Sequence, residues 1–231
     1  MKQLFFFLYC VALPVFGHDT ETKNEEIAVV AFASPGRFKP KPDAKFFEAS
    51  CTDFEASYLE AFATLNTFYK LESIEIEGIM TDKQAVALAA TLRSATFPLK
   101  SLVTHMSSWT PKAPSFQLGD EGLLALAKAC RDNPKIAATF ENFTYFWNNL
   151  SDSGGCELLD IIDHNFPQLE LICLDDTQVD LLTLHRALLL APRSKELLID
   201  LNDTIDDEDL DNVLSGALPE GWEKKEGKLN E

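Results

Sequence analysis

Basic residues are scarce in this chain of 231 residues. It has 20 lysines and arginines against 37 aspartates and glutamates, which gives a formal net charge of −17. A strongly acidic surface repels phosphate backbones and anionic lipid headgroups. We therefore expect no nucleic-acid partner, and we read the charge as one that keeps an exported protein soluble.

The sequence also lacks the motifs of common catalytic and cofactor sites. Its four histidines are scattered, and no H-E-x-x-H, C-x-x-C, G-x-S-x-G or glycine-rich phosphate loop occurs. The acidic stretch from Asp200 to Asp211 lacks the glycine and ligand spacing of an EF-hand loop. The sequence thus predicts a non-enzyme with no catalytic residue, no cofactor and no metal ligand. A hydrolase that uses scattered carboxylates, such as Asp152, Asp175 or Asp176, is the less favoured alternative.

Long apolar runs are missing as well. No segment is apolar for the roughly 20 residues that a membrane-spanning helix needs. A shorter run, from Leu4 to Phe16, follows the single positive charge of Lys2, and the small residues Val15 and Gly17 suit a signal-peptidase site. These features predict a signal peptide over residues 1–17 and a secreted or extracytoplasmic protein. No stable membrane anchor is expected after cleavage; a retained anchor is the alternative.

Cysteine is sparse, with five residues in the chain. Cys10 lies in the predicted signal peptide, which leaves Cys51, Cys130, Cys156 and Cys173. An even number in an exported chain permits two disulfides. The spacings form no compact framework, however, so buried free thiols are an equal alternative.

Residues 18–68 are expected to form an N-terminal capping region. The β-forming run Ile27–Phe32 predicts a strand that ends at Ser34, Pro35 and Gly36. From about Asp43 to Phe68, apolar residues recur at spacings of three and four, which predicts a helix.

Beyond this region the sequence repeats itself. Apolar residues recur at the first, fourth and sixth positions of units that begin at Leu71, Leu99, Phe140 and Leu169. The period is about 28 residues apart from one insertion, and a fifth, blurred unit surrounds Leu197. These positions are expected to point inward from short strands. In several units an Asp-x-Gly step follows, and we expect its Asp to cap the free amides of the helix that it opens.

The unit from Phe140 to Ile162 fits L-x-x-L-x-L-x-x-N-x-L-x-D-x-G followed by a helix, and the unit from Leu169 to Leu189 fits it with Thr177 in place of Asn. This pattern resembles the leucine-rich repeat of the ribonuclease-inhibitor-like type. The resemblance implies an α/β solenoid, with a short curved parallel sheet and helices on its outer face. It also implies function by protein binding. An ordinary α/β domain is the alternative fold.

The expected organisation is therefore a signal peptide (1–17), a capping region (18–68), a solenoid of about five units (69–215) and a charged C-terminal tail (216–231). The insertion in the second unit covers residues 105–117 and contains Trp109. Insertions in solenoids often map to one face and can carry binding; a merely tolerated insertion is the alternative.

Partner-binding candidates follow from the register of the units. Outward positions on successive strands predict a row of Glu75, Val103, Thr144 and Cys173. Phe146, Trp147 and Trp109 are the aromatic residues nearest that row, and exposed aromatics often anchor protein partners. Packing of Phe146 or Trp147 against the insertion is the alternative. The identity of the protein partner does not follow from the sequence, and a purely structural repeat protein is the runner-up function.

Three sequons mark possible N-glycosylation sites: Asn142, Asn149 and Asn202. In the proposed register Asn142 lies on the outward side of a strand, where a glycan would obstruct the concave face.

Overall fold

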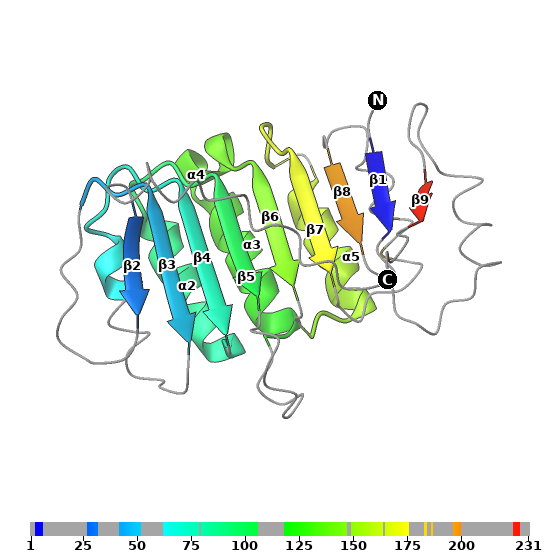
Figure 1. Ribbon diagram of the computed structural model, residues 1–231, viewed down its shortest axis with the longest axis horizontal. Helices are drawn as coiled ribbons and strands as arrows, with labels where there is room; N and C mark the ends of the chain where they lie inside the picture. Colours follow the sequence, from blue (N-terminus) through cyan, green and yellow to red (C-terminus); the bar gives the residue numbers. More distant parts are fainter. Residues whose placement is uncertain are drawn as a thin grey trace, which may run out of the picture.

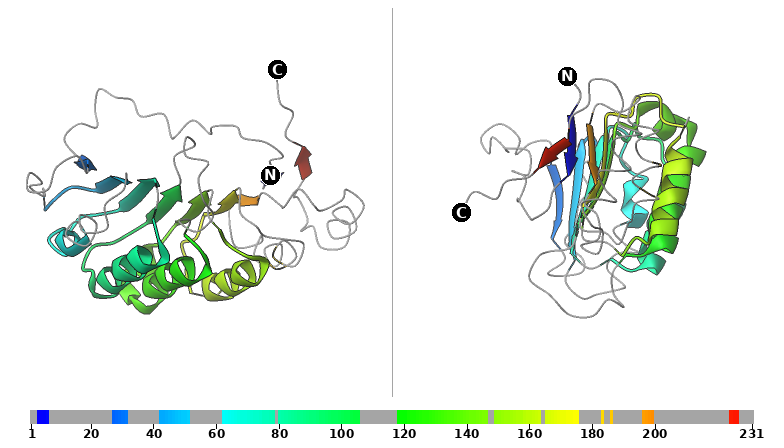
Figure 2. Two further views of the ribbon diagram at one scale, coloured as in Figure 1. Left: turned by 90° about the horizontal axis from the view of Figure 1, so that it is seen from below. Right: turned by 90° about the vertical axis from the view of Figure 1, so that its right-hand side faces the viewer.

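The fold is α/β: one parallel sheet with helices against one of its faces (Figures 1 and 2). The computed structural model describes residues 3–6, 27–31, 42–51, 62–78, 80–105, 118–146, 149–163, 165–175, 183, 186, 196–199 and 224–226. The sheet has nine strands in the order β2-β3-β4-β5-β6-β7-β8-β1-β9. Every pair of neighbouring strands is parallel.

The strands are short. From one end of the sheet to the other they are β2 (Ile27–Ala31), β3 (Phe46–Cys51), β4 (Ser73–Gly78), β5 (Ser101–His105), β6 (Asn142–Phe146), β7 (Leu171–Asp175), β8 (Glu196–Ile199), β1 (Gln3–Phe6) and β9 (Lys224–Glu226). Chain order and spatial order agree from β2 to β8. The strand predicted near Ile27 is confirmed as β2.

The helices connect these strands on one side of the sheet (Figure 2, right). They are α2 (Asp82–Ser94), α3 (Asp120–Asp132), α4 (Pro134–Thr139) and α5 (Asp152–Ile162), and α3 packs between α2 and α5. Helix α2 begins at a capping box, in which Thr81 and Gln84 each accept a hydrogen bond from the other's backbone amide. The side chain of Ser151 caps α5 in the same way, by accepting from the amide of Gly154.

The core lies between the sheet and these helices, and the predicted inward positions form it. Ile74, Leu102, Phe143, Ile172 and Leu197 stand side by side in successive strands, and so do Ile76, Thr104, Tyr145, Leu174 and Ile199. The residues of these two rows from β4 to β7 are at most 2% exposed. The inward placement predicted for Leu169, Ile172 and Leu174 is confirmed, since none is more than 9% exposed.

The predicted helix from Asp43 to Phe68 is wrong at its start, because Phe46–Cys51 is strand β3. Phe47 and Ala49 pair with Ile74 and Ile76 of β4. Ala44, Phe47 and Ala49 therefore occupy the same relative positions as Leu71, Ile74 and Ile76. Within the expected capping region the sheet thus continues without a break.

Neighbouring strands are also joined just before they begin. At each junction from β3 to β7, one backbone carbonyl accepts two amide hydrogens from the next strand's approach, over 2.7–3.1 Å. The accepting carbonyls belong to Lys45, Glu72, Lys100 and Glu141. This recurrence shows that each strand enters the sheet with the same backbone geometry.

Candidate interaction surface

The sheet face opposite the helices carries the row that the sequence predicts. Glu75 pairs with Val103, Val103 with Thr144 and Thr144 with Cys173. Glu48 of β3 precedes Glu75 in the same row, and Leu198 of β8 follows Cys173. The expected alignment across successive strands is therefore present.

The exposure of this row is not uniform. Glu75 and Val103 are partly exposed, but Thr144 is only 7% exposed and Cys173 only 1% exposed. The prediction that all four are accessible is therefore wrong for Thr144 and Cys173. Across the strands Thr144 stands between Val103 and Cys173, and Cys173 pairs with Leu198 on its other side. The size of these neighbours does not account for the burial of Thr144.

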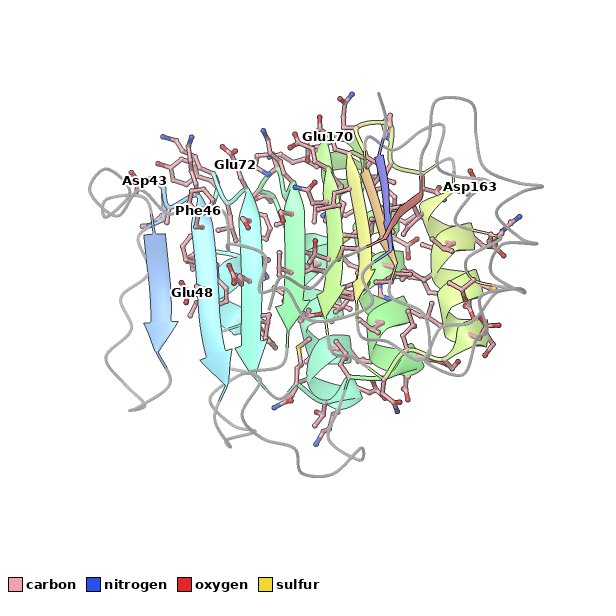
Figure 3. All side chains as sticks on the ribbon, turned by 45° about the vertical axis from the view of Figure 1, so that its right-hand side comes forward. Asp43, Phe46, Glu48, Glu72, Asp163 and Glu170 are labelled. Atoms are coloured by element: carbon pink, nitrogen blue, oxygen red, sulfur yellow. The ribbon has the colours of Figure 1, made fainter. Side chains whose placement is uncertain are left out.

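On this face every described position of β3, β4 and β5 is partly exposed, and we call these residues the β3–β5 face: Phe46, Glu48, Ser73, Glu75, Ser101 and Val103. Further along the face, Asn142 and Leu171 are partly exposed as well, but Thr144 and Cys173 beside them are buried. Phe46 and Glu48 are labelled on β3 in Figure 3. Glu48 and Glu75 place two carboxylates in neighbouring positions of this face, while Phe46 and Val103 add apolar surface.

Sequence reasoning missed Phe46 and Glu48 because it assigned their segment to a helix. The signal was present, however: Ala44, Phe47 and Ala49 repeat the offsets of Leu71, Ile74 and Ile76. The spacing of the aromatic residues from Phe46 onward also fits a helical period, and the prediction followed that period instead of the repeat offsets.

Charged residues alternate along the edge where the strands begin. The ammonium group of Lys100 lies 3.6 Å from a carboxylate oxygen of Glu72 and 3.4 Å from one of Glu141. Lys45 lies 3.5 Å from the other Glu72 oxygen, and Glu72 is labelled at this edge in Figure 3. The carboxylates of Glu141 and then Glu72 raise the pKa of Lys100 above its ordinary value. These four residues form a chain of ion pairs in which two lysines balance two glutamates.

The helix starts are joined by a second recurring contact. A carboxylate oxygen of Asp82 accepts the amide hydrogens of Gly119 and Gly122 over 2.8 and 3.0 Å. Asp120 accepts from the amide and hydroxyl of Ser151, and Asp152 accepts from the amide and hydroxyl of Thr183.

The expected role of the Asp in the Asp-x-Gly step is therefore wrong. Each carboxylate binds the start of the next unit, whereas Thr81 and Ser151 cap the helices that Asp82 and Asp152 open. A side chain on the glycine two residues after the Asp would meet the preceding unit. An added Cβ would stand 2.6 Å from Asp82 Oδ1 at Gly122 and 2.2 Å from Asp120 Oδ1 at Gly154. The glycine of the Asp-x-Gly step is therefore needed because neighbouring units pack closely at this point.

The aromatic candidates remain predictions. Trp109 and Trp147 lie outside the described residues, as does the side chain of Phe146, whose backbone ends β6 opposite His105 and Asp175. Among the described residues the exposed large hydrophobic side chains are Tyr69 at 54% and Val86 at 39%. Tyr69 was not predicted, because it stands between structural elements where periodicity gives no face.

Two of the three sequons lie in described structure. Asn142 begins β6 on the same face as Thr144, as expected, and is partly exposed. Asn149 lies just before α5, and its backbone amide donates a hydrogen bond to the Leu118 carbonyl over 2.8 Å. The hydroxyl of Ser151 in the second sequon is bonded to Asp120 over 2.6 Å. Asn202 lies outside the described residues.

Cys130, Cys156 and Cys173 are in the thiol form, outside any disulfide. Burial raises the pKa of the Cys130 thiol well above its usual range, so it stays protonated and unreactive. These three residues follow the free-thiol alternative. The side chain of Cys51, in β3, lies outside the described residues.

Of the carboxylates considered for a hydrolase, the structure describes that of Asp152, which accepts two hydrogen bonds from Thr183. Asp176 and the side chain of Asp175 lie outside the described residues. Within the described ranges no three His, Cys, Asp or Glu side chains gather as metal ligands would. No helix in those ranges has the length and apolar content to cross a membrane.

Comparison with protein-family models yields no match to this chain, and comparison with curated proteins yields no significant relative.

Proposed function

We propose that this chain is an exported leucine-rich-repeat protein, of the ribonuclease-inhibitor-like type, that acts by non-catalytic binding of another protein through the β3–β5 face. One observation carries the proposal: the described helices all lie against the same face of the sheet (Figure 2), and on the opposite face Glu75 and Val103 are aligned in neighbouring strands and partly exposed.

The repeat assignment draws support from contacts that recur between units. Residues at the same offset stand side by side in β4 to β7, and one backbone carbonyl bonds two amides at each junction. The Asp82, Asp120 and Asp152 carboxylates each bond the next unit. In repeat proteins each unit contacts mainly its neighbours, so contacts recur with the period.

The chemistry of the β3–β5 face fits a partner with basic and apolar groups. Glu48 and Glu75 supply negative charge, which attracts a cationic partner surface and raises its association rate. Phe46 and Val103 supply apolar area, from which a protein interface gains affinity when water is excluded.

Two substitutions of the same kind compare the β3–β5 face with the exposed side of helix α2 as the binding site. Val103→Lys places a positive charge within the β3–β5 face, and Val86→Lys places one on the exposed side of α2. Protein partners are captured with the unchanged chain from its native source, identified, and then titrated against each variant. We expect Val103→Lys to weaken binding at least about tenfold, or about 1.4 kcal/mol, because the lysine replaces apolar contact area and repels the basic groups of the partner. Val86→Lys should leave binding unchanged. Equal effects of both variants would refute a site on this face.

The aromatic candidate next to this face has a separate test. Trp147→Ala is expected to weaken partner binding about thirtyfold, since truncation of a buried aromatic anchor typically costs at least 2 kcal/mol. The fold should survive, because Phe140, Phe143, Tyr145 and Leu150 hold that unit's core. Unfolding of Trp147→Ala would identify Trp147 as a core residue instead.

Export is tested by the mass of the protein from its native source. We expect a chain that starts near His18, because the run Leu4–Phe16 precedes a small-residue site at Gly17. An intact N-terminus at Met1 in a soluble cytosolic fraction would refute export but not binding.

A further inference from the structure

Two residues are buried on the open face of the sheet, the face opposite the described helices (Figure 2). Thr144 of β6 is 7% exposed and Cys173 of β7 is 1% exposed. Asn142 and Leu171, two positions earlier in the same strands, are partly exposed. A local cover over the middle of β6 and β7, which leaves the starts of these strands accessible, accounts for this pattern.

The connection from β1 to β2 spans most of the sheet. β1 is eighth in the strand order and β2 is first, so seven strand spacings of about 4.8 Å, or roughly 34 Å, separate them (Figure 1). Because all the strands are parallel, β1 ends at one edge of the sheet and β2 begins at the other. Residues 7–26 join these two points.

The open face gives this connection its shortest route. A diagonal over that face is roughly 40 Å long, since the strands add about 17 Å along their length. About 21 residues from Phe6 to Ile27 reach up to roughly 70 Å. A route outside the helices adds the depth of their layer twice, about 15 Å each way, and requires an almost fully stretched segment. A relaxed segment therefore passes over the open face.

The composition of the connection matches the exposure of the strands along this route. Its first half, residues 7–16, is apolar, and its second half, residues 18–26, is polar. Even spacing along the diagonal puts the first half over β8, β7 and β6 and the second half over β5, β4 and β3. The buried Thr144 and Cys173 then lie under the apolar half. Val103 of β5, which is partly exposed, lies under the polar half.

The chemistry of the covered place also suits an apolar occupant. Cys173 behaves as a small apolar side chain, and Thr144 adds a methyl group. Contact with apolar side chains releases water from both partners. The carboxylates of Glu48 and Glu75 belong to β3 and β4, two or more strands away from β6.

We propose that the open face over β6 and β7 is the docking site of residues 7–16 of the same chain, and that removal of residues 1–17 uncovers it. The exported protein then presents the whole aligned row to its partner, because Thr144 and Cys173 extend the β3–β5 face. This second step rests on the proposed export. The chain thus gains its full binding surface only when it is processed.

Thiol labelling of the full chain, produced without a secretion step, tests the docking. Cys173 and Cys130 are both buried, but Cys173 lies on the open face and Cys130 in α3 on the helix side. Leu13→Glu with Val15→Glu places two charges in the apolar segment. We expect N-ethylmaleimide to label Cys173 at least about tenfold faster in this variant than in the unchanged chain, while Cys130 stays protected in both. Peptide masses identify the labelled cysteine.

Two matched variants test other long segments as the occupant. Met106→Glu with Phe116→Glu charges the insertion after β5, and Ala217→Glu with Leu218→Glu charges the connection from β8 to β9. Neither should change the labelling of Cys173. The proposal is overturned if either of them labels Cys173 as fast as the Leu13→Glu/Val15→Glu variant does. It is also overturned if that variant, with Cys130 protected, labels Cys173 no faster than the unchanged chain.

A photochemical crosslink decides the question if the charged variant unfolds, which labelling of Cys130 would reveal. Leu13 is replaced by the photoreactive and apolar benzoylphenylalanine in the otherwise unchanged full chain. On irradiation we expect crosslinks to peptides that contain β6 or β7. The same replacement of Tyr69, at an exposed position before β4, is the control and should give no crosslink to β7. Crosslinks from position 13 only to other parts of the chain overturn the proposal.

The docking, the uncovering and the export fail separately. A chain that starts at His18 should label Cys173 as fast as the charged variant does; slow labelling there, with Cys130 protected, overturns the uncovering step. If the charges uncover Cys173 but the native protein keeps residues 1–17, the docking stands and export is refuted. If the native protein starts near His18 but the charges leave Cys173 protected, export stands and the docking is refuted.

Discussion

The Asp120 carboxylate holds Ser151 at two points: Oδ1 accepts the Ser151 amide hydrogen over 2.8 Å, and Oδ2 accepts the hydroxyl hydrogen over 2.6 Å. Ser151 in turn caps α5 by accepting from the amide of Gly154 over 3.1 Å. One carboxylate of the preceding unit thus fixes both the start of α5 and its cap. The same carboxylate occupies the space that a side chain at Gly154 would need.

The first prediction is that the effect of Gly154→Ala depends on Asp120. In the unchanged chain the new methyl group would collide with Asp120 Oδ1, and we expect a loss of about 1–3 kcal/mol, as for an overpacked core. In an Asp120→Ala background the collision is absent. The same substitution should then stabilise α5, because alanine favours a helix over glycine by up to about 1 kcal/mol.

A double-mutant cycle measured by urea unfolding checks this reversal of sign. Gln168→Ala, at an exposed position beyond α5, is the control and should change the unfolding free energy by less than about 0.5 kcal/mol. The same destabilisation by Gly154→Ala in both backgrounds would mean that the Asp120 contact does not set the spacing between the units.

The second prediction contrasts two leucines on opposite faces of β7. Leu174 is fully buried, and Leu171 is partly exposed. Leu174→Ala should cost about 2–5 kcal/mol, the range for a large-to-small change in a core. Leu171→Ala should cost clearly less, since its side chain keeps contact with water. Denaturant melts of the two variants measure the difference, and similar costs would contradict the assigned faces.

This register could be read from the sequence because it depends on a local signal. Leu71, Ile74 and Ile76 share their spacing with Phe140, Phe143 and Tyr145, and strand alternation converts that spacing into a face. The same alternation placed Glu75 and Thr144 on one face. It could not show that Thr144 is shielded, because the alternation of one strand gives the face of a residue and not what covers that face.

Contacts between units were the other part that the sequence did not reveal. The Asp120 carboxylate lies next to its own helix start in sequence, so capping of that helix was the natural expectation. Its partner, Ser151, is 31 positions away. A pattern within one unit carries no information on which group of the next unit fills the space beside it.

The third prediction concerns the ion pairs at the strand-start edge. Because Glu141 and Glu72 raise the pKa of Lys100 in the folded chain, the charged lysine favours folding below its unfolded pKa of about 10.4. That contribution is lost as the pH rises through the higher folded value. The side chain is 41% exposed, so the contribution should be below about 1 kcal/mol.

Unfolding of Lys100→Gln and of the unchanged chain at pH 8 and pH 11.5 measures this effect. The stability difference between them should shrink at the higher pH and in 1 M salt. Lys70→Gln is the control, at an exposed lysine that lies 5.6 Å from the centre of the Tyr69 ring. A difference for Lys100→Gln that is the same at both pH values would show that the pairing with Glu141 and Glu72 contributes nothing to stability.

The last prediction concerns the hydroxyl of Tyr145, which is fully buried and has no hydrogen-bond partner among the residues that the structure describes. Burial, and then the neighbouring Cys130, raise the pKa of this phenol, so it stays neutral. An unpaired buried hydroxyl costs about 1–3 kcal/mol of desolvation, while the ring itself packs against Phe143 with centroids 6.0 Å apart.

Tyr145→Phe removes the hydroxyl and keeps the ring. We therefore expect it to leave the unfolding free energy unchanged or to raise it by about 1 kcal/mol, in urea melts beside Tyr69→Phe at an exposed site, where no change is expected. A loss of more than about 1 kcal/mol for Tyr145→Phe alone would mean that the hydroxyl has a partner in solution, such as a buried water molecule.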